Sequence, residues 1–344
     1  MSKTVNLGQE HVLTRAICDL FLRFLEAGEL NDKKHGIVDG VNQFMTEELT
    51  KRQITLCNFN IVKMLHELLS SDCPADCFLS ATKLTSLLLK NGNREVQTAL
   101  IQRMRKKDIE GKFFNKLKDS FNEAIKHINR SRYTYTSDIE EFKGGIDDAI
   151  LKKIELISIL PMLTQLTEGH YVDAQSLLLN QQQYNNTSHN IIEAAYLTLF
   201  SLVPSIEVFT RITRVHSEIL LLLLDFLSEC VQGPCIENQN ELIRLNIFAT
   251  CRIMLISPEL QYCYNKQGKN LLSDPKCKPR NPTLNNIKAK TMVLLSAVCE
   301  GQLSKELIDD LSSKIEPAVF KTAQHEGIFI YISLTYFITY MHYP

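Results

Sequence analysis

The chain has 344 residues, of which 44% are hydrophobic, only 13 are glycine and 10 are proline, and tryptophan is absent. This length can bury a sizeable core, and this composition favours helices over sheets. The formal net charge of −1 gives no overall attraction for nucleic acid or acidic lipid, so we expect no nucleic-acid partner.

Neither end of the chain carries a membrane signal. The N-terminus lacks a charged-then-apolar signal pattern, and no apolar run reaches the roughly 20 residues that span a bilayer. Ten cysteines are scattered without a recurring spacing, as in a reduced cytoplasmic protein. The pairs Cys73/Cys77 and Cys230/Cys235 lack further ligands at zinc spacing, so we expect no zinc site.

Apolar residues recur with helical periodicity along most of the chain. The predicted helices span residues 12–25, 54–69, 78–90, 94–105, 113–128, 139–166, 174–179, 191–202, 206–231, 237–256, 284–299 and 305–311. Their connections are short: Asn91-Gly92-Asn93 ends one helix and caps the next, and Ser188 is a candidate N-cap for the helix that begins at Ile191. Residues 129–137, 181–186 and 258–282 are predicted to be irregular.

Consecutive helices with tight turns and broad apolar faces predict an all-α fold, an armadillo-like α-solenoid of stacked helix pairs. No clean sequence repeat accompanies this pattern. Residues 94–132 hold eleven Lys or Arg against five Asp or Glu. This basic stretch is interpreted either as a solvated helix face or as a contact with an acidic neighbouring domain.

Acidic residues end three apolar helices: Glu168 in Thr-Glu-Gly-His, Glu229 after the five leucines 220–224, and Glu300 in Cys-Glu-Gly. A negative charge at a helix C-terminus opposes the helix dipole unless a cation compensates. Each residue alone is consistent with a solvated glutamate. Together they suggest a calcium site, because hard cations prefer clustered carboxylates and carbonyls. Phosphate-loop, serine-hydrolase and metalloprotease motifs are absent, so we expect no enzyme.

Four segments resemble one known family. They are 87–97 continuing through 107–114, 166–170 with Asp173 and 190–192, 228–239 (Ser-Glu-Cys-Val-Gln-Gly-Pro-Cys-Ile-Glu-Asn-Gln), and 294–301. In order and spacing they resemble the ryanodine and inositol trisphosphate receptors, the intracellular calcium-release channels, in the cytosolic solenoid that contains the RIH-associated domain. The first and last segments are more similar to ryanodine receptors, and residues 237–240 to inositol trisphosphate receptors.

The resemblance implies a solenoid that couples ligand binding to a distant pore. It implies that Glu168 and Glu229 bind the activating calcium, with second-shell support from His170 and Gln232. It also implies that Glu300 affects calcium sensitivity through packing. The family completes this site with a carbonyl from a domain after the pore helices. Since we find neither in this chain, we expect an incomplete calcium site.

The resemblance and the composition divide the chain into four predicted parts. These are an N-terminal solenoid segment (1–135), the RIH-associated helical domain (150–258), following solenoid helices (283–326) and a divergent apolar tail (327–344). Three origins are considered for the tail: read-through of a splice boundary, a truncated gene model, which we favour, and a strand-like extension.

The main hypothesis is a fragment or short paralogue of a calcium-release channel. This chain would act as the calcium-sensing and coupling solenoid on the cytosolic face of the endoplasmic or sarcoplasmic reticulum. Its partners would be other domains or subunits of the channel. The alternative is a free-standing cytosolic armadillo-type scaffold that binds partner helices.

Overall fold

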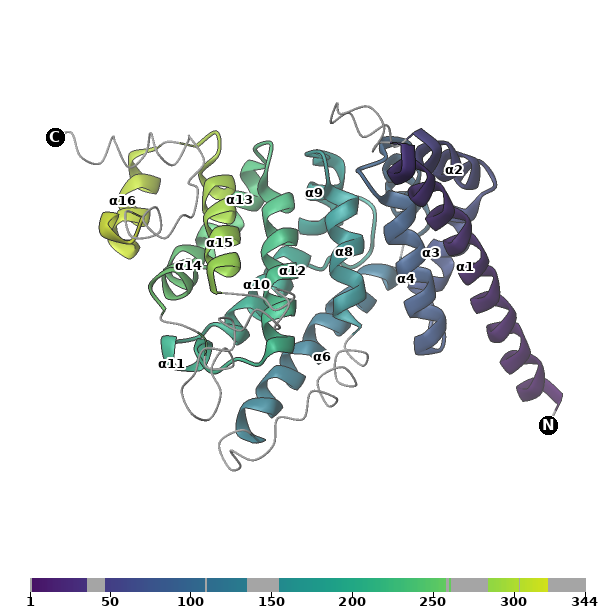
Figure 1. Cartoon of the computed structure of the whole chain (residues 1–344), viewed down its shortest axis with the longest axis horizontal. Coiled ribbons are helices and arrows are strands. Elements are labelled where there is room, and N and C mark those ends of the chain that lie inside the picture. Colours follow the sequence, from purple (N-terminus) through teal and green to yellow (C-terminus); the bar gives the residue numbers. More distant parts are fainter. Residues whose placement is uncertain are drawn as a thin grey trace. The chain divides into compact units, whose positions relative to one another are not determined.

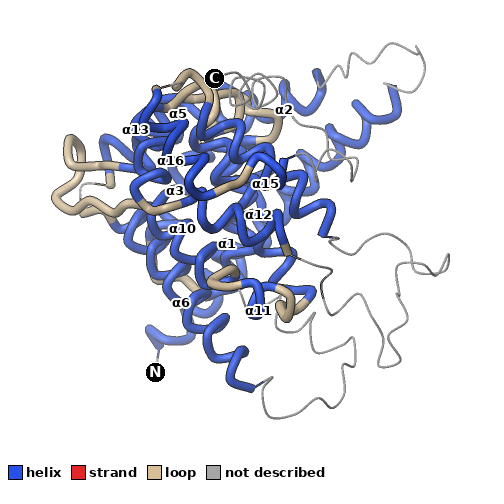
Figure 2. The backbone as a smooth tube through the Cα atoms, turned by 90° about the vertical axis from the view of Figure 1, so that its left-hand side faces the viewer, coloured by secondary structure: helices blue, strands red, loops and turns tan. Residues whose placement is uncertain are grey.

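The computed structural model describes residues 2–35, 47–134 except 109, 155–257, 260, and 284–320 except 303. Every regular element in this part of the chain is a helix, as Figure 2 shows. Helices that follow one another in the sequence pack together, for example α2 on α3 and α12 on α13. This confirms the predicted all-α fold of stacked helices. None of the described helices is long and apolar enough to cross a membrane.

The chain divides into two compact units, and each unit takes two segments of the sequence. Unit 1 consists of Met1–Asp119 and Ser158–His189, and unit 2 of Ser120–Ile157 and Asn190–Pro344. The four predicted parts of the chain are not tested by this division. The predicted tail, 327–344, lies outside the described residues.

Figure 1 labels most of the helices in sequence order. Those of unit 1 are α1 (Ser2–His35), α2 (Glu47–Asn58), α3 (Ile61–Ser70), α4 (Ala75–Leu89), α5 (Arg94–Lys107), α8 (Leu156–Thr167) and α9 (Val172–Leu179). Helix α6 (Lys112–Thr134) runs from unit 1 into unit 2. Those of unit 2 are α10 (Ile191–Leu202), α11 (Ile206–Phe209), α12 (Arg214–Val231), α13 (Ile236–Arg244), α14 (Ile247–Ile256), α15 (Leu284–Cys299) and α16 (Lys305–Lys314).

Each unit has its own apolar core. In unit 1, Phe78, Phe113 and Phe114 are almost completely buried, and the last two rings meet edge to face with centroids 5.2 Å apart. In unit 2, the leucine-rich helix α12 packs on α10, α13 and α15. Three neighbours explain why its sequence is apolar over such a broad face.

Three predicted helices are each two helices in the structure. The predictions 54–69 and 237–256 run through Asn60 and Asn246, which have positive φ angles of 58° and 70° and so break the helix. Asparagine adopts this left-handed conformation more readily than most residues. The prediction 206–231 runs through the end of α11 and the start of α12. The apolar periodicity continues across all three breaks, so it could not reveal them.

Two local predictions about connections were wrong. The N-cap of α10 is Asn190, whose side chain accepts the Glu193 N–H at 2.9 Å. The predicted cap, Ser188, instead accepts the Gln181 N–H at 3.0 Å within the preceding loop. Residues 129–134, predicted to be irregular, continue α6. The predicted cap Asn93 is confirmed, since its side chain accepts the Val96 N–H.

Candidate functional site

Glu168 directly follows the last residue of α8, and it begins a turn with left-handed backbone conformations. The next two residues, Gly169 and His170, both have positive φ angles, of 74° and 57°. This turn closes the carbonyl end of α8 and leaves His170 exposed, while the Glu168 side chain is half-buried. The predicted calcium ligand therefore lies at a tightly constrained helix end.

Two residues of the α4–α5 region hold this helix end. The side-chain amide of Gln97 donates to the backbone carbonyls of Gln165 at 3.0 Å and Glu168 at 2.9 Å. The backbone N–H of Gly92 donates to the Glu168 carboxylate. Gly92 has φ 61°, and a Cβ there would lie 3.1 Å from the Glu168 carbonyl oxygen, so this close approach requires glycine.

The Glu168 carboxylate is only partly satisfied. Burial raises its pKa, against the opposing effects of hydrogen bonds from Gln165 and Gly92 and of the charge on Lys90. Its Oε2 atom is buried and has no hydrogen-bond partner among the described residues. A buried acceptor without a donor costs free energy, and a cation is one group that can satisfy it.

Basic side chains of α5 contact the connection between α8 and α9 in the same unit. Arg94 donates to the Gly169 carbonyl at 3.0 Å and lies over the Tyr171 ring, 4.2 Å from its centroid. Arg105 pairs with Asp173 at 2.7 Å. Part of the basic stretch therefore fixes the segment that follows Glu168.

Glu229 and Gln232 lie at the end of α12 in unit 2. Glu229 is half-buried on the last turn of the helix, and Gln232 is the C-cap, with its N–H donating to the Ser228 carbonyl at 3.0 Å. Gly233 follows with φ 80°. The predicted end of this helix before Gly233-Pro234 is therefore confirmed.

Glu300, at the end of α15, is part of a contact with this same turn. Its carboxylate accepts the Gly233 N–H at 2.9 Å. A Cβ on Gly301 would lie 2.7 Å from Pro234 Cγ, so the two turns pack closely. Gln239 of α13 donates to the Ala297 carbonyl at 2.8 Å and the Glu300 carbonyl at 2.9 Å.

The same arrangement thus occurs once within each unit. A turn glycine (Gly92 or Gly233) donates its N–H to a helix-ending glutamate (Glu168 or Glu300). A fully buried glutamine on the helix after that turn (Gln97 or Gln239) donates to two carbonyls, three residues apart, at that glutamate's helix end.

Sequence analysis missed these glutamines. In the sequence alone, Gln97 and Gln239 cannot be told from solvated glutamines on a surface helix. The available signal is their position, five or six residues after a turn glycine and on the apolar side of the helix. A related contact is made by Gln53 of α2, which donates to the Leu87 and Lys90 carbonyls at the end of α4.

The two predicted calcium ligands belong to different units: Glu168 to unit 1 and Glu229 to unit 2. Their pairing stays a prediction, as do the second-shell roles of His170 and Gln232. Within the described residues, no group of three or more His, Cys, Asp or Glu side chains could hold a metal ion. Any calcium site here would therefore depend on backbone or amide oxygens in addition to these carboxylates.

Part of the chain that contains Glu168 and Glu229 is similar to a known protein family. Residues 151–255 match the family model RIH_assoc, described as RyR and IP3R Homology associated. This segment is similar to the RyR and IP3R homology associated domain. The match confirms the resemblance to ryanodine and inositol trisphosphate receptors over these residues. No curated protein matches the chain. The homology associated domain contains Glu168 and Glu229, whereas Gly92, Gln97 and Glu300 lie outside it.

Proposed function

We propose that this chain is the calcium-sensing and coupling part of an intracellular ligand-gated calcium-release channel, as a fragment or short paralogue that lacks the pore. The relation to these receptors rests on the homology associated domain. The observation that supports calcium sensing is the half-buried Glu168 carboxylate, which keeps one buried oxygen without a donor. No enzymatic activity is proposed.

The coupling role follows from what holds Glu168. Its carboxylate accepts the Gly92 N–H, and its carbonyl accepts the Gln97 amide. A divalent ion that binds the carboxylate through its free oxygen would draw negative charge away from the Gly92 N–H and so change the α4–α5 turn. Such a coupled change is the kind of differential contact that a sensing domain requires.

The same proposal implies a cellular location and binding partners for the chain. The chain would lie on the cytosolic face of the endoplasmic or sarcoplasmic reticulum and contact other domains or subunits of the channel. A free-standing armadillo-type scaffold remains the second candidate function, because stacked helices also present surfaces for partner helices. Sequencing the transcript beyond the codon for residue 325 separates the two candidates, since coding sequence for pore helices identifies a channel.

The calcium proposal is tested with the full chain. We expect weak binding, with a Kd of about 10⁻⁴–10⁻³ M, as in sites with few protein ligands. Calorimetry would measure calcium binding, and tyrosine-sensitised terbium luminescence would report the same site, because the chain has Tyr171 near Glu168 and no tryptophan. The double variant Glu168→Gln/Glu229→Gln should lose the signal.

The matched control is Glu237→Gln, which removes an exposed carboxylate from the first turn of α13. It should bind calcium as the wild type does. Equal calcium responses in the wild type and the Glu168/Glu229 double variant would remove the calcium site and leave the scaffold as the better candidate.

A further inference from the structure

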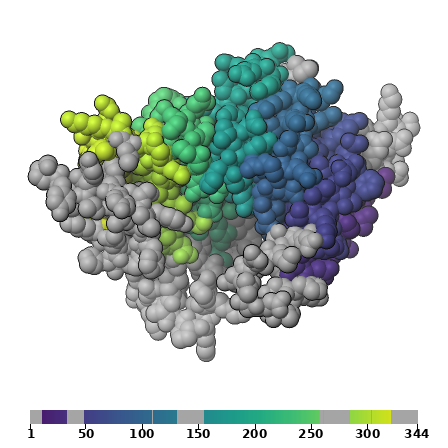
Figure 3. Space-filling model, turned by 90° about the horizontal axis from the view of Figure 1, so that it is seen from above, coloured from purple at the N-terminus to yellow at the C-terminus, as the bar shows by residue number. Residues whose placement is uncertain are grey.

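Helix α1 has an apolar face that the chain leaves exposed. The exposed fractions of Val12, Leu13, Leu20 and Leu30 are 72%, 63%, 65% and 54%, and that of Phe24 is 39%. Ala16 and Ala27 are also exposed. At about 100° per residue these seven residues fall within a sector of about 120°, and they follow α1 for about 27 Å. Part of α1 is visible in purple on the surface in Figure 3. We call these seven residues the α1 stripe.

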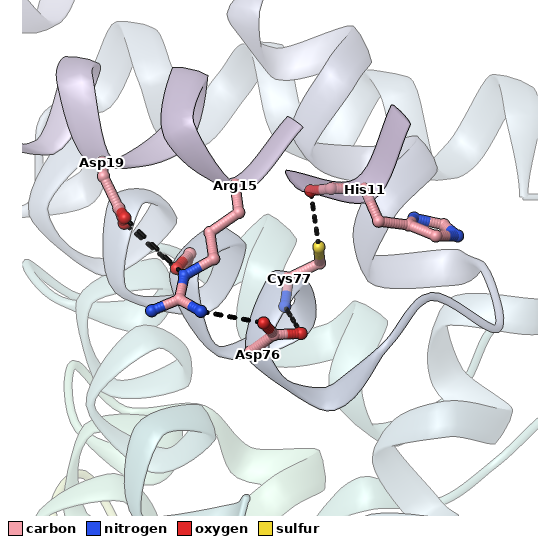
Figure 4. A network of polar contacts seen from close by, with 6 residues as sticks. His11, Arg15, Asp19, Asp76 and Cys77 are labelled. Atoms are coloured by element: carbon pink, nitrogen blue, oxygen red, sulfur yellow. Dashed lines mark hydrogen bonds and ion pairs between the residues drawn. The ribbon is translucent and has the colours of Figure 1, made fainter. Parts of the chain in front are cut away.

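The opposite face of α1 is already occupied within unit 1, where it packs on α2 and α4. Cys18 and Leu25 are buried there, and a Cβ on Gly28 would lie 2.8 Å from the side chain of Arg52. Figure 4 shows the polar contacts of the same helix, in which Arg15 pairs with Asp76 at 2.9 Å. Since α1 is fixed on one side, the α1 stripe is a preformed surface. Exposed apolar patches of this kind are typical of interaction sites.

Five of the seven residues of the α1 stripe are spaced symmetrically about Leu20, and Val12 and Leu30 lie outside this symmetry. Leu13 and Ala27 lie seven residues before and after it, and Ala16 and Phe24 lie four residues before and after it. In a two-fold antiparallel helix pair, a residue at one distance before the axis meets the residue at the same distance after it. Each such meeting here joins a large side chain to an alanine: Leu13 to Ala27 and Phe24 to Ala16. A parallel pair would instead place Phe24 on Phe24 and Ala16 on Ala16.

Charges beside the α1 stripe favour the same orientation. Arg15, Asp19 and Glu26 lie along one margin of it, and Arg23 lies just inside that margin. In the antiparallel pair, Arg15 comes nearly level with Glu26 of the other copy, and Asp19 with Arg23. Each meeting joins opposite charges, whereas in a parallel pair this margin would face the other margin of the second copy and these charges would not meet. Flanking charges set orientation in paired helices in this way.

We propose that the α1 stripe is a self-association surface, on which a second copy of this chain docks through an antiparallel α1–α1 pair with its two-fold axis at Leu20. The large-to-small matches and the paired charges select a second copy over an unrelated helix. Because a single helix face is smaller than a standard stable interface, association is concentration-dependent.

Sedimentation of the full chain over a range of concentrations tests the proposal. The wild type is expected to show a monomer–dimer equilibrium. Leu20→Glu places two carboxylates together on the axis and should raise the dimer Kd at least tenfold. The control, Leu197→Glu, makes the same change at a 44% exposed leucine on α10 and should leave the Kd unchanged. Equal thermal unfolding of the three proteins establishes that folding is intact, and Leu20→Ser provides a milder variant should Leu20→Glu unfold.

Orientation is tested by disulfide formation under mild oxidation. A mixture of the Ala16→Cys and Phe24→Cys variants should cross-link between copies, while Ala16→Cys alone should behave as the wild type, whose native cysteines provide the background. A wild type that is monomeric at all concentrations, a dimer that Leu20→Glu leaves unchanged, or cross-linking of Ala16→Cys with itself would each overturn the proposal.

Discussion

His66 on α3 is a buried histidine whose ring centroid lies 6.5 Å from that of Phe113. It is 4% exposed, and neither ring nitrogen has a hydrogen-bond partner among the described residues. Burial and, to a smaller extent, the charge of Arg103 together lower its pKa to about 4, while the charge of Glu67 acts in the opposite direction. The folded protein therefore holds His66 as the neutral imidazole at physiological pH.

Folding stability should consequently fall in mild acid. The pKa of His66 in the folded chain, about 4, lies below the usual value of 6.5. Between these two pH values the unfolded chain binds a proton at His66 and the folded chain does not. The free energy of unfolding falls as the pH drops from about 6.5 to about 4, by up to about 3 kcal/mol. Urea unfolding at several pH values would measure this.

The variant that isolates this effect is His66→Leu, which should remove the slope between pH 6.5 and 4. His66→Gln serves as the control for polarity, because it keeps a buried polar group that does not titrate in this range. If the wild type and His66→Leu lose stability equally over this interval, the acid sensitivity arises elsewhere.

At the residue scale, sequence analysis named the acidic members of the candidate site as predictions and did not name the amide members. Glu168 could be predicted because a carboxylate at a helix C-terminus opposes the helix dipole and so stands out. Gln97 could not, since an uncharged amide gives no such conflict, and its role depends on carbonyls 68 and 71 residues away in the sequence. A single sequence does not reveal contacts at that separation.

At the element scale, the capping glutamines Gln53, Gln97 and Gln239 each close the end of another helix. The last carbonyls of a helix lack partners within it and need donors from elsewhere. One side-chain amide with two N–H groups satisfies two of them at once. The connection between helices therefore depends on specific hydrogen bonds as well as on apolar packing.

Replacing one of these glutamines should be costly. Gln97→Met keeps a similar length but leaves the Gln165 and Glu168 carbonyls without their donor, at a cost of about 1–3 kcal/mol for each acceptor left buried. Chemical denaturation of the full chain would measure the change in unfolding free energy.

The matched control for this substitution is Gln102→Met, at an exposed position on the same helix. It should change stability by no more than about 0.5 kcal/mol. Similar effects of the two substitutions would show that the Gln97 hydrogen bonds contribute little.

Helix existence was more predictable than helix boundaries. The amphipathic segments 94–105 and 191–202 correspond closely to α5 and α10, because their apolar periodicity begins and ends near the helix boundaries. The long predicted segments hid internal breaks, since Asn246 changes the backbone direction without interrupting the apolar pattern. Such breaks depend on one backbone angle, which periodicity does not encode.

At the scale of the whole molecule, the compact units do not coincide with the segment that matches a family. Residues 151–255 supply most of α8 and all of α9 to unit 1, and helices α10 to α13 with nearly all of α14 to unit 2. Each unit therefore combines this segment with other parts of the chain. Boundaries predicted from resemblance follow the sequence, whereas compactness follows contacts between distant segments.

We expect the isolated segment 151–255 to fold poorly. It would lack Gln97, which closes the end of α8, and also α15, which covers α12 and accepts from Gln239. Circular dichroism should show less helix per residue than in the full chain, and thermal unfolding should be broad. A fragment with a sharp, cooperative transition would contradict this expectation and show that the segment is an independent domain.

The contact at Glu168 also constrains how the sequence can vary. Gly92 has no room for a side chain, Gln97 has both amide hydrogens committed, and Glu168 supplies acceptors to both residues. A substitution at any one of these three positions removes a contact that the other two residues need. We therefore expect positions 92, 97 and 168 to vary together in related sequences, although α5, α6 and α8 lie between the first position and the last.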